Sequence, residues 1–298
     1  MDASRSYEDL VVRRELWVAC LGNDDRHGIQ QQLLSGVMEC AVFRMSIKMR
    51  NLAPAAGTGG GIQLNGLFFQ MLDHSFIQAQ TAAVRRLSDR SYPIAHAGKG
   101  RDKSVYSLSA LLVDMRDWAP QMTRENLMRL AGQPDVHPQW PELHLSHTID
   151  WLCGTTESSR TDDDVVSPVL FDFLLNKIAI ACADITKWAT AYVAHAASPA
   201  SRPEEGQLSV SWLAIWSAYE ALASVAHLIR VWVLGGAHVV IMPTMQSDVA
   251  QWLDRPLVGS EDLQAVRDVW ATSVADTERW LQDSKSVRDE LAAFLQSA

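Results

Sequence analysis

The chain has 298 residues, of which 48% are hydrophobic and 20% are charged, and its formal net charge is −9. This composition is ample for one large core or two smaller ones. The acidic balance gives no general attraction for nucleic acid, so any contact with RNA would need a local basic patch.

The cysteines and the apolar segments indicate where in the cell the protein is expected. Four cysteines show no paired spacing: Cys20, Cys40, Cys153 and Cys182. Three lie in apolar helical patterns, so we expect reduced, buried thiols in a cytoplasmic protein. The acidic N-terminus does not resemble a signal peptide. The closest approach to a membrane span is 208–242, which Glu220, His227 and Arg230 interrupt. We interpret it as a buried core helix and expect no membrane partner.

Apolar residues recur at helical spacing along most of the chain. The pattern predicts these helices, in chain order: 6–21, 24–51, 64–87, 107–118, 123–130, 167–197, 209–234 and 260–298. Segments rich in proline and glycine separate several of them, and no segment has a persuasive strand pattern. The predicted fold class is therefore all-α, a helical bundle with long central helices, in one large domain.

Local signals fix several boundaries. Ser107 is a good N-cap and Pro120 closes the helix that follows it. Ser167 and Pro168 are a strong start for a central helix roughly 45 Å long. The polar, proline-containing stretch 132–164 is the candidate linker between two possible halves of a helical core that spans 1–258. Residues 259–298 form an amphipathic helix with a near-heptad seam, docked on this core or at an interface.

Three motifs follow one another in a familiar order: AAVRRLSDR, then SLSALLVDMRDWAPQMTREN after a variable loop, then AYVAHAASPASR. This order resembles bacterial helical proteins of the HEPN superfamily, specifically the U-type abortive-infection branch, over about residues 60–250. The resemblance implies an all-α and often dimeric core, and a link to phage defence or a toxin–antitoxin pair. In active members it implies a metal-independent ribonuclease site, where a His acts as general acid/base and an Arg stabilises charge on the phosphate.

His195 matches the histidine of this family motif. The arginine expected four to six residues earlier would fall at Thr190, Ala189 or Trp188, none of which is basic. Lys187, the nearest upstream cation, is eight positions away, which is roughly 12 Å on a straight helix. Either the cation comes from elsewhere in the fold, or this chain cannot cleave RNA.

Other cations could complete a composite site with His195. The candidates are Arg85 and Arg86 at the end of an earlier helix, and Arg202 just past Pro199. Each has a plainer interpretation as well. His195 suits a helix-capping or core histidine, and Arg85 and Arg86 suit an ion-paired helix end.

Arg90 and His96 offer a second match to the spacing, with five residues between them. Pro93 breaks the helix that such a site would need, so the alternative is a coincidental match in a solvated loop. The histidines near Cys153 lack regular ligand spacing, and we expect neither a metal nor a cofactor.

Two hypotheses follow from these patterns. The first is a HEPN-like protein that touches RNA through the Arg85–Arg90 region and His195, as an endoribonuclease if it is active. The second is a non-catalytic helical scaffold for dimerisation or partner binding. Under both we expect a homodimer, with RNA or a cognate protein as the further partner.

Overall fold

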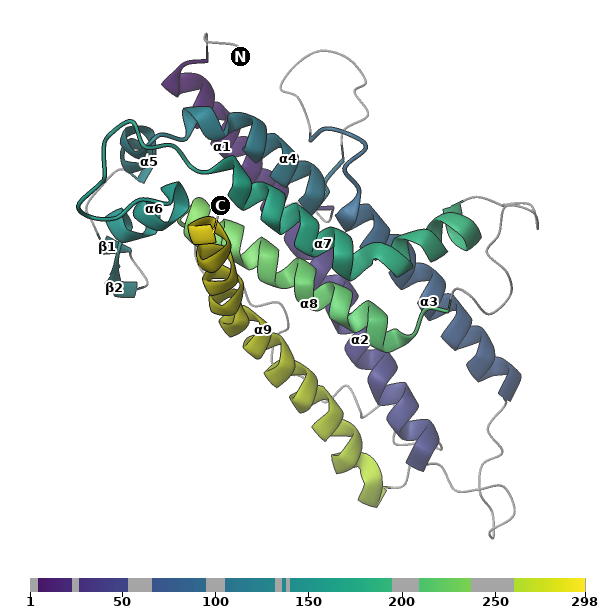
Figure 1. The fold of residues 1–298 in the computed structure, drawn as a ribbon. Helices are drawn as coiled ribbons and strands as arrows, with labels where there is room; N and C mark the ends of the chain where they lie inside the picture. Colours follow the sequence, from purple (N-terminus) through teal and green to yellow (C-terminus); the bar gives the residue numbers. More distant parts are fainter. Residues whose placement is uncertain are drawn as a thin grey trace.

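The fold is an elongated bundle of helices (Figure 1). The computed structural model describes residues 5–22, 27–52, 66–94, 105–131, 136–137, 140–194, 209–236 and 260–297. Within these ranges the chain is helical apart from one small hairpin and the connecting turns, which confirms the all-α fold class.

The described helices, in chain order, are α1 Tyr7–Leu21, α2 Ile29–Leu52, α3 Gly66–Ser88, α4 Leu108–Trp118, α5 Arg124–Ala131, α6 Leu145–Cys153, α7 Pro168–Ala189, α8 Trp212–Leu228 and α9 Leu263–Ser297. The hairpin consists of β1 Val136–His137 and β2 Trp140–His144, which pair antiparallel. The sequence did not predict these strands, because two residues of one strand and five of the other are too few to show an alternating pattern.

Side-chain caps set several helix starts, as the sequence predicted. The Ser107 hydroxyl accepts a hydrogen bond from the backbone N–H of Ala110 at 3.4 Å. The same hydroxyl donates to the carbonyl oxygen of Leu87 at 2.9 Å, so one side chain links the end of α3 to the start of α4. Pro120 lies in a 3₁₀ turn that closes α4, and Thr123 caps α5 by accepting from the N–H of Asn126 at 3.1 Å.

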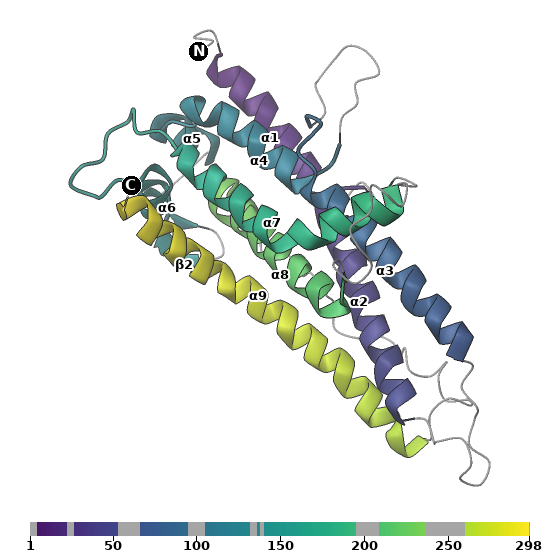
Figure 2. The ribbon, with the colours of Figure 1, turned by 45° about the vertical axis from the view of Figure 1, so that its right-hand side comes forward.

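Five long helices form the body of the bundle. In Figures 1 and 2, α2 and α7 run in one direction, and α3, α8 and α9 run in the opposite direction. The most extensive contacts are between α3 and α7, between α8 and α9, and between α2 and α9. The antiparallel arrangement of α3 and α7 determines which residues can meet at a site.

The core is one continuous cluster of buried apolar side chains. The α7 stripe that faces it consists of Leu170, Phe171, Leu174, Leu175, Ile178, Cys182, Ile185 and Ala189. Both α7 and α8 continue into a π-helical turn, Thr190–Ala194 and Ile229–Val233 respectively. These turns were not predicted, because a π turn keeps apolar residues within a helical pattern and differs only in its hydrogen bonding.

Helix α9 packs on α8 and α2, so the seam read from the sequence faces this chain's own core. Trp280 packs edge-on against Trp216, with the ring centroids 4.6 Å apart. Arg44 of α2 donates to Asp276 and to Ser273 of α9, at 3.2 and 3.1 Å. Polar residues within the seam, such as Ser273, therefore take part in a largely buried polar contact between two helices.

The expected linker at 132–164 is structured within its described part. It contains α6, and Ile149 and Leu152 belong to the common core. Arg124 and Asp150, both more than 90% buried, form an ion pair that joins α5 to α6, and Arg160 also pairs with Asp150 at 2.9 Å. The polar run therefore folds back onto the helices that it connects, and the described residues share one core.

Helix α8 and the cysteines follow the sequence-based expectations about burial. The segment Trp212–Val233 is long and apolar enough to cross a membrane, but 72% of its most apolar window is buried, as in the core helix of many folds. All four cysteines are free; Cys153 is half-buried and the other three are buried. Burial raises the pKa of the Cys20 thiol to about 11 and that of Cys182 to about 12.

Candidate functional site

The structure places three of the six predicted site residues. Arg85 is half-buried and Arg86 exposed in the last turn of α3, and Arg90 is exposed just beyond it. His96, His195 and Arg202 lie outside the described residues. The composite site with His195 and the pair of Arg90 with His96 therefore stay predictions.

The described helices limit how a composite site could form. Ser88, at the end of α3, hydrogen-bonds Cys182 in the second half of α7. Ala194, the last described residue of the α7 segment, lies twelve residues further along, which is about 18 Å at the helical rise. Because α3 and α7 are antiparallel, Arg85 and Arg86, which precede Ser88 by three and two residues, lie about one turn past Cys182 toward the end of α7.

Arg86 instead lines a hollow between α2 and α3, with a volume of about 840 Å³. We call it the α2–α3 hollow. Its lining residues are His27, Gln32, Ser35, Gly36, Glu39, Ala79, Gln80, Ala82, Ala83, Arg86, Asp89, Val105 and Tyr106. Its size falls within the range of small-molecule and cofactor pockets.

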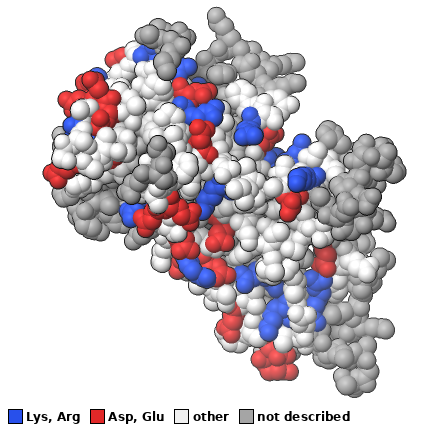
Figure 3. Space-filling model, viewed as in Figure 1, with Lys and Arg blue, Asp and Glu red and all other residues white. Residues whose placement is uncertain are grey.

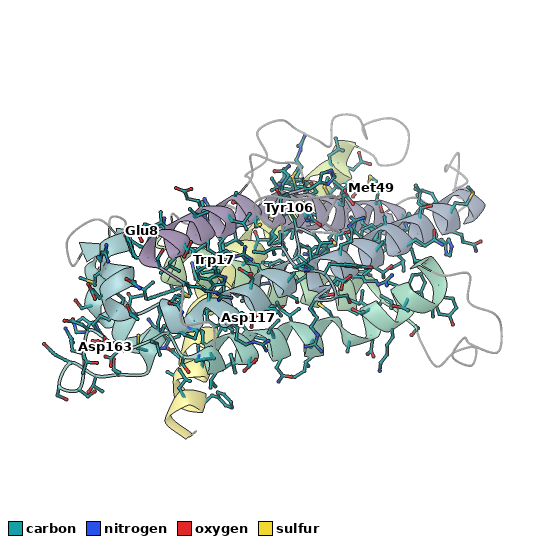
Figure 4. All side chains as sticks on the ribbon, turned by 90° about the horizontal axis from the view of Figure 1, so that it is seen from above. Glu8, Trp17, Met49, Tyr106, Asp117 and Asp163 are labelled. Carbon is teal, nitrogen blue, oxygen red and sulfur yellow. The ribbon has the colours of Figure 1, made fainter. Side chains whose placement is uncertain are left out.

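The rim of the hollow is held by hydrogen bonds to backbone groups. The Gln32 side chain donates to the carbonyl oxygens of His27 and Tyr106, at 2.7 and 2.9 Å. Tyr106, labelled in Figure 4, therefore lies beside α2. Together with the Ser107 cap, these bonds attach the segment before α4 to both helices of the hollow.

The inner wall of the hollow is a series of hydrogen-bonded polar groups that begins in the core. The Tyr219 hydroxyl, fully buried, donates to the Gln80 side-chain oxygen at 2.8 Å. Gln80, 1% exposed, donates in turn to the carboxylate of Glu39. Because the hydroxyl fixes which end of the Gln80 amide accepts, the amide nitrogen must face an acceptor, and Glu39 supplies it.

Gly36 leaves the space that this series of hydrogen bonds needs. A Cβ added at Gly36 would lie 2.1 Å from the Tyr219 hydroxyl oxygen, far inside van der Waals contact. Only glycine at this point of α2 lets the tyrosine ring reach Gln80. The helix forms despite the low helix propensity of glycine, because the close packing of α2 on α8 compensates for it.

The charges at the hollow have both signs. Burial, and then the nearby Cys40 and Glu39, raise the pKa of Tyr219 well above its usual value, and Arg86 acts against this shift. The hydroxyl therefore stays neutral at physiological pH and acts as a fixed donor. A guanidinium, two carboxylates and a histidine surround the open space, which suits a ligand with an anionic group and several hydrogen-bond donors.

Elsewhere charged side chains of both signs lie next to one another at several places on the face in Figure 3, with uncharged residues between them. Among the described residues, no three His, Cys, Asp or Glu side chains cluster as metal ligands would. His147 lies 3.8 Å from Asp150, whose carboxylate is already bonded to Arg124 and Arg160.

Sequence reasoning identified Arg86 but missed the rest of the hollow. Two signals were present: Gly36 in the middle of a long helix, and the polar pair Gln80 and Thr81 within an apolar helix, which are both buried. Each signal indicates unusual packing at that position, but neither identifies the residue that packs against it.

Comparisons of the chain with protein-family models, with curated proteins and with solved structures found no match. The resemblance to HEPN proteins therefore rests on the three sequence motifs alone.

Proposed function

We propose that this protein is a HEPN-like helical protein that binds RNA at the α2–α3 hollow. One observation carries the proposal: Arg86, from the first of the three family motifs, lines a hollow large enough for a nucleotide, together with several hydrogen-bonding side chains. Arginine is well suited to phosphate, because its guanidinium can form two parallel hydrogen bonds with the phosphate oxygens.

The other lining groups suit the rest of a nucleotide. Glu39 and Asp89 can accept hydrogen bonds from ribose hydroxyls or from base amino groups, and Gln80 holds Glu39 in place. Such contacts are typical of single-stranded RNA, whose bases are free to leave the stack. Since the net charge is −9, we expect few phosphate contacts and a shallow dependence of affinity on salt.

We assign RNA binding, and not RNA cleavage, to the α2–α3 hollow. Arg86 lies roughly 15 Å along α7 from Ala194, the last described residue of that segment, and we therefore propose binding without cleavage at the hollow. A link to phage defence or a toxin–antitoxin pair comes from the resemblance and belongs to the same proposal. Growth arrest on induced expression, lost with Arg86→Ala, supports that link, and unimpaired growth counts against it.

Fluorescence anisotropy with a labelled RNA of about ten nucleotides tests the binding. We expect Arg86→Ala to weaken binding about tenfold for every sequence tried and to reduce the salt slope by about one. Arg279→Ala removes the same charge from an exposed site on α9 and should leave both quantities unchanged. No RNA binding by the native chain, or equal losses in the two variants, would contradict the proposal.

Cleavage is tested separately with total RNA in EDTA. Degradation by the native chain that His195→Ala abolishes would establish a metal-independent ribonuclease whose histidine lies outside the described residues. Intact RNA together with binding at Arg86 would leave the protein as an RNA-binding relative that does not cleave.

A further inference from the structure

A second hollow lies between α7, α8 and α9, with a volume of about 630 Å³. We call it the α7–α8–α9 groove. The residues that line it are Phe173, Asn176, Lys177, Ile180, Ala181, Ser217, Glu220, Ala221, Ser224, Asp283, Ser286, Val287 and Glu290. None of them belongs to the α2–α3 hollow, so a ligand here would contact other residues than those proposed to bind RNA.

The floor of the groove consists of small side chains. Ser217, Ala221 and Ser224 are four and then three residues apart on α8, which places them on one face of that helix. Small residues on such a face let another helix approach closely, and packed helices lie about 8–10 Å apart. The groove extends along 173–181 of α7, about 12 Å, which is two turns of a helix.

One wall of the groove is apolar and open to solvent. The side chain of Ile180 is 70% exposed, and Phe173 packs against Phe294, which is 44% exposed, with the ring centroids 5.7 Å apart. Exposed aromatic and branched side chains beside a groove are typical of a protein interaction site.

The acidic charge of the groove favours a partner with positive charge. Its lining contains three carboxylates, on Glu220, Asp283 and Glu290, and one ammonium group, on Lys177. Lys177 pairs with Glu290 at 3.1 Å, so the other two carboxylates dominate the charge. In Figure 3 acidic side chains, with Lys and Arg among them, gather on the part of the face where Figure 1 shows the second half of α9.

Repulsion within the groove supports the same conclusion. Burial, and then the nearby Asp283, raise the pKa of the Glu220 carboxyl above its usual value. A cation placed between Glu220 and Asp283 would offset this repulsion, whereas a nucleic acid would increase it.

We infer that the α7–α8–α9 groove binds a basic amphipathic helix of a partner protein. About two turns of this helix would fill the groove. Its Lys or Arg side chains would lie between Glu220 and Asp283, and its apolar side chains would cover Ile180 and Phe173. Helix-in-groove recognition of this kind uses anchors three, four and seven residues apart.

The test uses a labelled alanine-based peptide of about 15 residues, the length at which an isolated helix begins to be stable. It carries Lys and Leu at those spacings. We expect anisotropy to report binding to the full-length protein, and Glu220→Gln with Asp283→Asn to weaken it at least about tenfold. Ile180→Ser should weaken it as well, and added salt should reduce the affinity of the native chain.

Matched controls separate the groove from the general negative charge of the protein. Glu8→Gln with Asp163→Asn removes two exposed carboxylates elsewhere, both labelled in Figure 4, and should leave the affinity unchanged. A peptide with Glu in place of Lys should not bind, nor should a peptide of equal composition that contains a central proline. Equal losses in the two double variants, binding of either control peptide, or no binding of the basic peptide would overturn the inference.

Discussion

The two hollows of this bundle treat polar groups in opposite ways. In the α2–α3 hollow, a buried tyrosine, a buried amide and a carboxylate form a closed series of hydrogen bonds that reaches the open space. In the α7–α8–α9 groove, burial and then the nearby Asp283 raise the pKa of the partly exposed Glu220 carboxyl. The side chains of the first region are therefore held in place before any ligand binds, and their tight packing tolerates few substitutions. In the second region, a cationic partner would offset the repulsion between the carboxylates. Substitutions in the first should weaken the fold, and those in the second should not.

Gly36→Ala should give the largest effect. The new Cβ would overlap the buried Tyr219 hydroxyl, and relieving the overlap would break the bond to Gln80. We expect the free energy of unfolding to fall by about 3 kcal/mol, measured by urea denaturation. Gly22→Ala is the control, because its Cβ would meet no side chain, only the backbone carbonyls of Val18 and Ala19, whose oxygens lie at 3.2 and 3.4 Å. A second change, Tyr219→Leu, should recover part of the loss, and no recovery would show that the contact is not the cause.

Tyr219→Phe should give an intermediate effect, because it keeps the ring and removes only the hydroxyl. The Gln80 oxygen would be left buried without its donor, which costs about 1–2 kcal/mol. If the hydroxyl also orients Gln80 and Glu39 for RNA, affinity should fall in the same variant. Unchanged stability would mean that Gln80 finds another partner and that the inner wall is not pre-organised.

Glu220→Gln should give the smallest effect, and in the opposite direction. The native state takes up a proton on Glu220 at a higher pH than the unfolded chain does, so the wild type loses stability as pH rises through the folded-state pKa. Burial, and then Asp283 and Asp276, favour the protonated form of Glu220, and Arg279 and Lys177 oppose it. Near pH 7 we therefore expect the variant to be more stable than the wild type. The gain should be only a few tenths of a kcal/mol, because solvent screens the charges at this site.

The pH dependence makes the Glu220 prediction specific. The stability difference between Glu220→Gln and the wild type should shrink toward zero as the pH falls below the ordinary glutamate range, followed by urea denaturation across the series. A difference that stays constant with pH would show that the substitution acts through packing.

The fold was largely predictable from the sequence, and the hollows were not. Apolar spacing and capping residues such as Ser107 are local signals, and the helices they predicted are present. The bond between Gln80 and Tyr219 joins residues 139 positions apart, and no local pattern encodes it. The same holds for Glu220 and Asp283, which meet only because α8 and α9 pack side by side. The arginines of α3 were found because they lie in a short, charged motif.

The four free cysteines make opening of the bundle measurable by chemistry. A thiol modifies readily only as its thiolate, and burial disfavours the thiolate of Cys40 strongly, one turn along α2 from Gly36. Alkylation of Cys40 under native conditions would therefore proceed only when α2 separates from α8. The rate at which Cys40 gains the mass of the alkylating group would report how often the two helices separate and whether a bound ligand keeps them together.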